Sequence, residues 1–276
     1  MPTTDALLRA AIGGAPDALT LTLDPAFQGL PDTAHGGTLL AVFDALADLG
    51  GPREIVGHYR RRVPLGVTLT LDVERSPTGV GCRVLDATAN VLVEGRVHRV
   101  PGVESTGAPA AGDTPLPVSR TCFACGIDNP LGLRARLAFD AGRVAGTWTP
   151  DARFVGADGR LASVALTTLL DEAAFWLGAL ATGESGMTTE LRVTLHGRVD
   201  SGPVRVSGER AAVRPRADDA RYWDTRVGAW DERGRLVAQA VITFVTVRGA
   251  ARRLVNGLLD LNPRENLRRI FPAYVA

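Results

Sequence analysis

The 276-residue sequence contains no lysine, and all 31 of its basic residues are arginines. Enzymes that form a Schiff base through lysine, and P-loop enzymes that bind phosphate with one, are therefore excluded. The arginines are balanced by 30 acidic residues, which gives a formal net charge of +1. This balance of charges gives no indication that the protein binds nucleic acid.

Cysteine is scarce, with Cys82, Cys122 and Cys125 only. An odd number of cysteines in a chain with no recognisable signal peptide leads us to expect a reducing, cytoplasmic location. Cys122 and Cys125 form a Cys-x-x-Cys pair, but a structural zinc site needs four ligands and no second Cys/His pair follows in the sequence. We therefore expect no metal.

Long uninterrupted hydrophobic runs are also missing. The longest apolar stretch, residues 161–181, carries Asp171 and Glu172 at its centre, which makes it a poor membrane span. It predicts instead a buried helix with a carboxylate flanked by apolar turns. Burial of an unpaired carboxylate is costly and raises its pKa, as is typical of a working acid. Adjacent helix residues point about 100° apart, so only one of the two faces a given neighbour.

A second apolar helix is predicted over residues 34–50, and it opens with His35, Gly36 and Gly37. The first N–H groups of a helix have no partner within it and lie at the positive end of its dipole. Such an end can receive a carbonyl oxygen that develops negative charge; alternatively, the glycines only let the backbone pass close to another element. Asp44 follows about 13 Å along the axis, so an acid acting at this end must come from another helix.

The sequence contains an internal duplication. Residues 147–156 repeat residues 20–29 at an offset of 127 positions, with five of ten residues identical, and the same offset places Asp44 on Asp171. The offset then grows to 136 and later to 144. We expect about nine additional residues in the second copy, near residues 181–189.

The duplication divides the chain. We expect an N-terminal unit over residues 1–100, a linker rich in Pro, Gly, Ala, Ser and Thr over 101–120, a C-terminal unit over 121–247, and an appendage over 248–276. Within the first unit, a short helix from Asp5 to Ile12 is expected to end at two glycines. Period-two patterns predict strands over residues 20–23, 54–62, 66–74 and 81–100, the last broken near residue 89.

Two further motifs accompany the helix that starts at residue 34. Residues 59–66 read Tyr-Arg-Arg-Arg-Val-Pro-Leu-Gly, and residues 122–133 read Cys-Phe-Ala-Cys-Gly-Ile-Asp-Asn-Pro-Leu-Gly-Leu. With the Phe-x-Gly loop and the His-Gly-Gly helix start, this order resembles the hotdog-fold thioesterases, in particular the phenylacetate-pathway and 4-hydroxybenzoyl-CoA branch. The resemblance implies an α+β double hotdog, two units each with a long central helix wrapped by a curved antiparallel sheet.

The resemblance also implies where a site lies. In that family the glycine-rich helix end comes from one unit and the acid from its neighbour. Here this pairs Gly36 or Gly37, as donors to the oxyanion, with Asp171 as base or nucleophile. His35 then shapes the loop or holds the thioester, and Glu172 is the second choice of acid.

The second copy differs from the first at the start of its central helix. Ala162, Ser163 and Val164 stand where the first copy has His-Gly-Gly. The opposite site, which would pair Asp44 with this helix end, is therefore expected to be degenerate.

Substrate contacts are expected on both sides of the helix start. Arg60 and Arg62 share one face of the predicted strand with His58, where they either bind the phosphates of a CoA carrier or form a solvated strand end. Phe27 and Gly29, in the loop that leads into the helix, are the other expected contacts.

The leading function is an acyl-CoA thioesterase that acts on an acyl-CoA or acyl-carrier thioester. CoA enters only as part of the substrate, with no metal or redox cofactor, and the tandem chain can pair further as a homodimer. One alternative is an acyl-binding module that has lost turnover. Another is a hotdog hydratase or dehydratase, but that branch uses an Asp followed five residues later by His, which no Asp in this sequence has.

Overall fold

The structure, a computed structural model, describes residues 2–107, 112–197 and 199–275. Its two central units contain the same elements in the same order. The first comprises β2 (Ala18–Leu21), α2 (Gly36–Ala47), β3 (Arg53–Tyr59), β4 (Leu69–Ser76), β5 (Gly79–Leu85) and β6 (Val91–Arg99). The second comprises β9 (Arg143–Trp148), α3 (Ser163–Thr182), β10 (Gly186–Leu195), β11 (Val204–Glu209), β13 (Tyr222–Trp230) and β14 (Leu236–Thr246).

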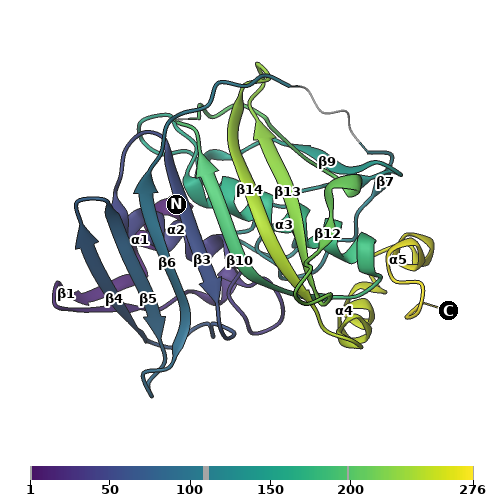
Figure 1. Cartoon of the computed structure of the whole chain (residues 1–276), viewed down its shortest axis with the longest axis horizontal. Helices are drawn as coiled ribbons and strands as arrows, with labels where there is room; N and C mark the ends of the chain where they lie inside the picture. Colours follow the sequence, from purple (N-terminus) through teal and green to yellow (C-terminus); the bar gives the residue numbers. More distant parts are fainter. Residues whose placement is uncertain (1, 108–111, 198, 276) are drawn as a thin grey trace.

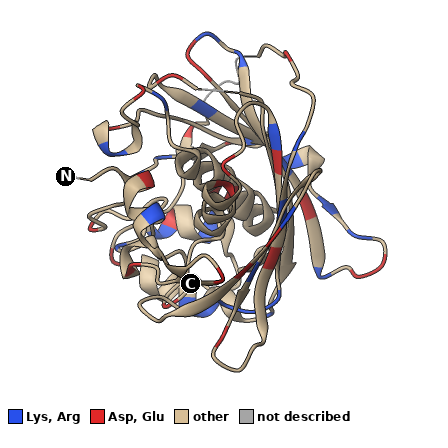
Figure 2. Cartoon of the chain, turned by 90° about the vertical axis from the view of Figure 1, so that its left-hand side faces the viewer, with Lys and Arg blue, Asp and Glu red and all other residues tan. Residues whose placement is uncertain are grey.

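One antiparallel sheet joins the units, and its strand order reads the same from either end. The order β2-β4-β5-β6-β3 is followed by β10-β14-β13-β11-β9, so that β3 and β10 form the central seam. Leu191 pairs with Gly57 in this seam. The sheet curves around α2 and α3, which lie side by side on its inner face (Figures 1 and 2). This is the predicted α+β double hotdog.

The remaining elements are short and extend the two ends of the sheet or cover the helices. They are α1 (Thr4–Ala10), β1 (Ile12–Ala15), β7 (Thr114–Pro115), β8 (Ala138–Phe139), β12 (Arg214–Pro215), α4 (Ala250–Leu258), α5 (Arg264–Ile270) and the 3-10 turns at Pro25–Phe27, Ala152–Phe154 and Arg210–Ala212. The first two of these turns lie 127 positions apart, as the duplication predicts.

Two predicted boundaries are wrong. The N-terminal helix ends at Ala10, and residues 12–15 form β1, which pairs with β2 and so extends the sheet. The strand expected to run through residue 62 ends at Tyr59, after which Arg60 and Arg61 both donate their N–H groups to the Leu92 carbonyl. Arg60 and Arg62 therefore lie beyond the strand and do not share a strand face with His58.

The additional residues of the second unit are also placed differently from expectation. Helix α2 ends at Asp48, which has a left-handed backbone (φ 50°), whereas α3 continues for 20 residues to Gly183 (φ 67°). At the offset of 127, Ala174 corresponds to the last residue of α2. Most of the insertion is thus two extra turns of helix at residues 175–182, which precede most of the expected range of 181–189.

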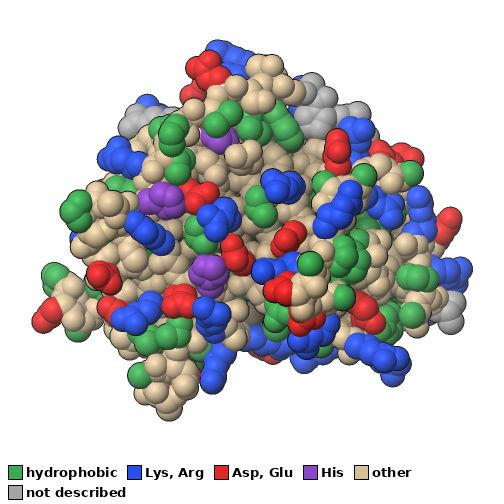
Figure 3. Space-filling view, viewed as in Figure 1, with side chains coloured by type: hydrophobic (Ala, Val, Ile, Leu, Met, Phe, Trp, Pro, Cys, Tyr) green, Lys and Arg blue, Asp and Glu red, His purple; other side chains and the backbone are tan. Residues whose placement is uncertain are grey.

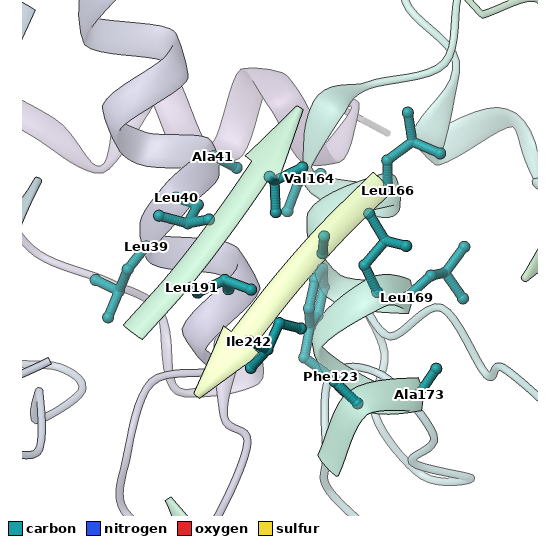
Figure 4. Packing of buried hydrophobic residues seen from close by; sticks show 14 of the residues in the cluster. Leu39, Leu40, Ala41, Phe123, Val164, Leu166, Leu169, Ala173, Leu191 and Ile242 are labelled. Atoms are coloured by element: carbon teal, nitrogen blue, oxygen red, sulfur yellow. The ribbon is translucent and has the colours of Figure 1, made fainter. Parts of the chain in front are cut away.

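Helices α2 and α3 cross at a point of close backbone contact. A Cβ atom on Gly37 would lie 2.5 Å from the carbonyl of Thr167 and 2.6 Å from the Cα of Thr168, so only glycine fits there. Beyond the crossing, apolar side chains of the two helices and of the inner face of the sheet form one core (Figure 4), among them Leu39, Leu40, Leu166, Leu169, Leu191 and Ile242.

The predicted linker and appendage both pack against the second unit. Thr106 forms a β-bridge with Arg235, and β7 pairs with β8. The Asn262 side chain donates to the Val118 carbonyl (2.8 Å) and accepts from its N–H (2.7 Å). Residues 108–111 of the predicted linker lie outside the described residues, and the unit boundaries stay a prediction.

The outer face of the sheet is polar, with charges of both signs and histidines mixed over it (Figure 3). Arg192, for example, donates to Glu54 across the seam at 3.0 Å. Among the described helices, α3 is long and apolar enough to cross a membrane. Here 83% of its most apolar 18-residue window is buried inside the protein, where it serves as the core helix of the second unit.

Candidate active site at the junction of the units

The N-terminus of α2 is held in place by the loops around it. His35 is the N-cap residue, with extended backbone angles (φ −65°, ψ 135°). Its N–H donates to the Phe27 carbonyl at 2.9 Å, and the Ala34 N–H donates to the Val63 carbonyl at 2.9 Å. The loop before the helix and the segment after β3 therefore fix the direction in which the helix end points.

Asp171, in the middle of α3, lies against this helix end. Its Oδ2 atom accepts the Gly37 N–H at 3.1 Å and lies 3.3 Å from His35 Nδ1, while its Oδ1 atom accepts the Thr188 hydroxyl at 2.9 Å. The residue is only 6% exposed. The structure thus brings together the acid of one unit and the His-Gly-Gly end of the other, as predicted, whereas their roles stay a prediction.

Gly36 and Gly37 differ in what they offer a substrate. The Gly37 N–H is engaged by Asp171, but the Gly36 N–H has no acceptor among the described residues. The Tyr59 hydroxyl donates to the Gly36 carbonyl at 2.7 Å and so fixes the orientation of the peptide group. Of the two predicted donors, Gly36 is the one left free to bind an oxyanion.

Burial and neighbouring charges set the protonation of this cluster. Burial raises the pKa of Asp171, although the nearby His35 and the hydrogen bonds from Thr188 and Gly37 favour the ionised form. Burial lowers the pKa of His35, but the hydrogen bond to Glu172 and the charge of Asp171 outweigh it and raise the pKa to about 9. The Gly37 N–H is shared between two acceptors, because it donates to His35 Nδ1 at 3.2 Å as well as to Asp171 Oδ2 at 3.1 Å.

Glu172 does not face the helix end as Asp171 does. Its Oε1 atom accepts the Trp176 indole N–H at 2.9 Å, and its Oε2 atom lies 3.9 Å from His35 Nε2. Cys122 completes this side of the cluster: donor atoms of His35, Cys122 and Glu172 all lie within 4.8 Å of one another. A hydrogen bond from Cys125 is the main cause that lowers the pKa of the Cys122 thiol.

Cys122 reaches His35 because the opening segment of the second unit docks on the first. The Phe123 N–H donates to the Gln28 carbonyl at 2.6 Å, and the Asn129 side chain donates to the Ala26 carbonyl at 2.7 Å. The rings of Phe27 and Phe123 pack 5.1 Å apart. Phe27, predicted as a substrate contact, is therefore part of the core.

A cavity of about 590 Å³ extends from the Asp171 cluster. One part of its lining is apolar and comes from α3, β10, β14 and α4: Phe175, Trp176, Met187, Val245, Leu254 and Leu258. The other part is basic: Arg60, Arg61, Arg62 and Arg216. Gly29 lines the cavity as predicted.

The arginines of the cavity differ in their partners. Arg60 forms an ion pair with Glu94 at 2.6 Å. Arg61 and Arg62 are exposed and form no ion pair with any residue that the structure describes. They are thus the arginines whose guanidinium groups are available to an anionic ligand.

The duplicated position Asp44 is closed off. Arg53, which is half-buried, donates to both carboxylate oxygens of the buried Asp44, at 2.5 and 2.7 Å. The helix end of the second unit begins at Ala162 and Ser163 and has no side-chain cap, and Asp44 forms no hydrogen bond with it in the described part of the chain. The Asp44 carboxylate is instead paired with Arg53, and the degeneracy of the second site stays a prediction.

Sequence reasoning missed Thr188 and the position of Cys122. Thr188 lies at a β-bulge of β10, where the pairing with β14 skips a residue, and no spacing rule predicts which side chain a bulge presents. Sequence reasoning also assigned no role to Tyr59. This residue lies in the Tyr-Arg-Arg-Arg motif, which was the signal that could have pointed to it.

The sequence matches no protein-family model, and no curated protein matches it. Solved structures do match. A Thermobifida fusca protein proposed to be a thioesterase II is 20% identical, with a TM-score of 0.63 over 88% of this chain and 99% of that one. The TesB protein of Mycobacterium avium subsp. paratuberculosis is 15% identical, with a TM-score of 0.62 over 87% and 98%. The dehydratase domain of the CurJ module of the curacin polyketide synthase is 11% identical, with a TM-score of 0.56 over 89% and 90%.

These matches cover nearly the whole length of each protein, and they include both thioesterases and a dehydratase. At such low identity they show the fold. The chain has a double-hotdog fold.

Proposed function

We propose that this protein is an acyl-CoA thioesterase that hydrolyses its substrate between α2 and α3. The observation that carries the proposal is the buried Asp171 carboxylate lying beside a helix N-terminus whose Gly36 N–H is free. A general base next to an oxyanion donor is what hydrolysis of an acyl group requires.

In the proposed reaction Asp171 removes a proton from water as the water oxygen attacks the thioester carbonyl. The Thr188 hydroxyl, 2.9 Å from Oδ1, holds the carboxylate. The Gly36 N–H and the helix dipole stabilise the oxyanion. When the tetrahedral intermediate collapses, the C–S bond breaks and the proton held by Asp171 passes to the leaving thiolate. Attack by Asp171 itself, through an anhydride, is the second form of the mechanism.

The cavity supports a thioester with an apolar acyl group and an anionic carrier. Its apolar lining is suited to an acyl chain, whereas Arg61 and Arg62 are suited to the phosphates of CoA or of a carrier-protein arm. A cytoplasmic location, and pairing of the tandem chain into a homodimer, belong to the same proposal.

A second candidate function is dehydration, because hotdog dehydratase domains share the fold. The absence of an Asp with His five residues later in the sequence argues against it. A third candidate is acyl binding without turnover. The changed sequence at the start of α3 supports this candidate, because it shows that one half of the duplication has lost the His-Gly-Gly motif.

The deciding experiment is a panel of acyl-CoA thioesters with detection of the released thiol. We expect turnover by the wild-type protein and its loss in Asp171→Asn. Tight binding of acyl-CoA without thiol release would favour the binding module, and interconversion of 3-hydroxyacyl and enoyl thioesters would favour the dehydratase.

A further inference from the structure

We propose that His35, Cys122 and Glu172 bind a divalent transition-metal ion, and that Zn²⁺ is the ion their donor atoms fit best. The proposal does not rest on the thioesterase activity, because Asp171 is not one of the three ligands.

The three donors converge from separate parts of the chain. His35 caps α2, Cys122 lies in the segment that opens the second unit, and Glu172 lies in α3, yet their donor atoms lie within 4.8 Å of one another. All three residues are buried, with exposures of 6%, 8% and 7%. An imidazole nitrogen, a thiolate and a carboxylate are the donors that zinc takes, at bond lengths of about 2.0 to 2.3 Å, so small side-chain shifts close the site.

Each donor is oriented by a neighbour that is not itself a ligand. Asp171 lies 3.3 Å from His35 Nδ1, which leaves Nε2 to face Glu172. The Trp176 indole N–H donates to Glu172 Oε1 at 2.9 Å, so Oε2 is the carboxylate oxygen left to bind the ion. The Ala124 N–H donates to Cys122 Sγ at 3.3 Å. A carboxylate behind a histidine is the usual arrangement at metal-binding histidines, where it fixes the ring and its tautomer.

The charge of the cluster is also compatible with a bound cation. Asp171 and Glu172 are two buried carboxylates with one imidazole between them, and no arginine forms an ion pair with either in the described part of the chain. On binding, a divalent ion takes the places of the protons on His35 Nε2 and Cys122 Sγ, which leave to solvent. The net charge of the cluster is therefore unchanged, and binding of the ion buries no additional charge.

The site has three protein ligands and an open fourth position. The Cys125 thiol lies 3.9 Å from Ser119 Oγ and falls outside the group of three. All three ligands line the cavity, so the fourth position faces it and is filled by water.

The test is a titration of the metal-free, reduced protein with Co²⁺ and then Zn²⁺. We expect one equivalent of Co²⁺ to give a thiolate-to-cobalt charge-transfer band, which one equivalent of Zn²⁺ then removes. Cys122→Ser should abolish the band. Cys82→Ser, at a buried cysteine in β5, is the matched control and should keep it.

Two further variants keep the test decisive if Cys122→Ser does not fold. Glu172→Gln should keep the thiolate band but weaken Co²⁺ binding, and Asp171→Asn should weaken it about 10- to 100-fold through the loss of the group behind His35. Absence of the band in the wild-type protein, its persistence in Cys122→Ser, or unchanged affinity in both carboxylate variants would overturn the proposal. Thioester turnover does not enter this readout, so either proposal can fail while the other stands.

Discussion

The Oδ2 atom of Asp171 lies only 2.6 Å from the position that a Cβ atom would take on Gly36. The acid of one unit therefore occupies the space that the missing side chain of the other unit leaves. This relationship makes the glycine a condition for the approach of the carboxylate.

Gly36→Ala keeps the backbone N–H but should displace Asp171 from the helix end, and a base misplaced by about 1 Å should lower thioester turnover by about 100-fold. Gly50→Ala is the control, because a Cβ there would meet nothing within 4 Å. Steady-state kinetics on one accepted acyl-CoA measures the effect. Full activity in Gly36→Ala would mean that the contact has no part in catalysis.

Asp171→Asn should mainly lower turnover, whereas Asp44→Asn should mainly lower stability. Removal of the base at Asp171 should lower kcat by about 10² to 10⁴-fold while the protein stays folded. Asp44→Asn should keep turnover but lower the free energy of unfolding by about 2 kcal/mol, because the half-buried Arg53 loses its charged partner.

Urea unfolding and kinetics on both variants distinguish these outcomes. Arg53→Met, which leaves Asp44 unpaired, should be destabilised in the same way. Equal losses of turnover in the two aspartate variants would indicate two working sites and contradict the asymmetry.

Leu258 is expected to help set the acyl length. It lines the cavity from α4 and is only 3% exposed. Leu258→Trp should shift kcat/KM towards shorter acyl chains, since the larger ring fills the apolar part of the cavity. Leu259→Trp, one residue further along and not in the lining, is the control. An unchanged chain-length profile in Leu258→Trp would show that the acyl group lies elsewhere.

Arg62→Gln should raise KM for an acyl-CoA by about tenfold, which corresponds to the loss of one charge-assisted hydrogen bond to a phosphate. KM for the same acyl group on N-acetylcysteamine, which has no phosphate, should not change. Arg83→Gln, at an exposed arginine paired with Asp72 outside the cavity, serves as the control. If both substrates were affected alike, Arg62 would act on the acyl end and not on the carrier.

The duplication made much of this site predictable from sequence. The offset of 127 alone placed Asp171 at the position of Asp44, and the length of the helix showed that the acid must come from the other copy. Both inferences use local periodicity and fixed helix geometry, which the sequence carries directly. The Asp171 and Gly37 contact follows from them.

Contacts that depend on loops and bulges were not predictable in this way. Cys122 meets His35 only because residues 121–133 dock on the loop at Gln28, about 95 positions earlier, and nothing in the local pattern encodes that distance in space. The expectation of no metal considered only ligands close in sequence, whereas the fold brings His35, Cys122 and Glu172 together from distant positions. Arg53, which pairs with Asp44, precedes the predicted strand over residues 54–62, and no motif in the sequence marks it.

The seam between β3 and β10 has a thermodynamic consequence. Two separate hotdog chains would form such a seam at a rate and to an extent that depend on their concentration. Here both strands belong to one chain, so the seam forms at an effective concentration set by the connection between the units. Dilution leaves that value unchanged, and the Asp171 and Gly36 pair stays assembled in a single molecule.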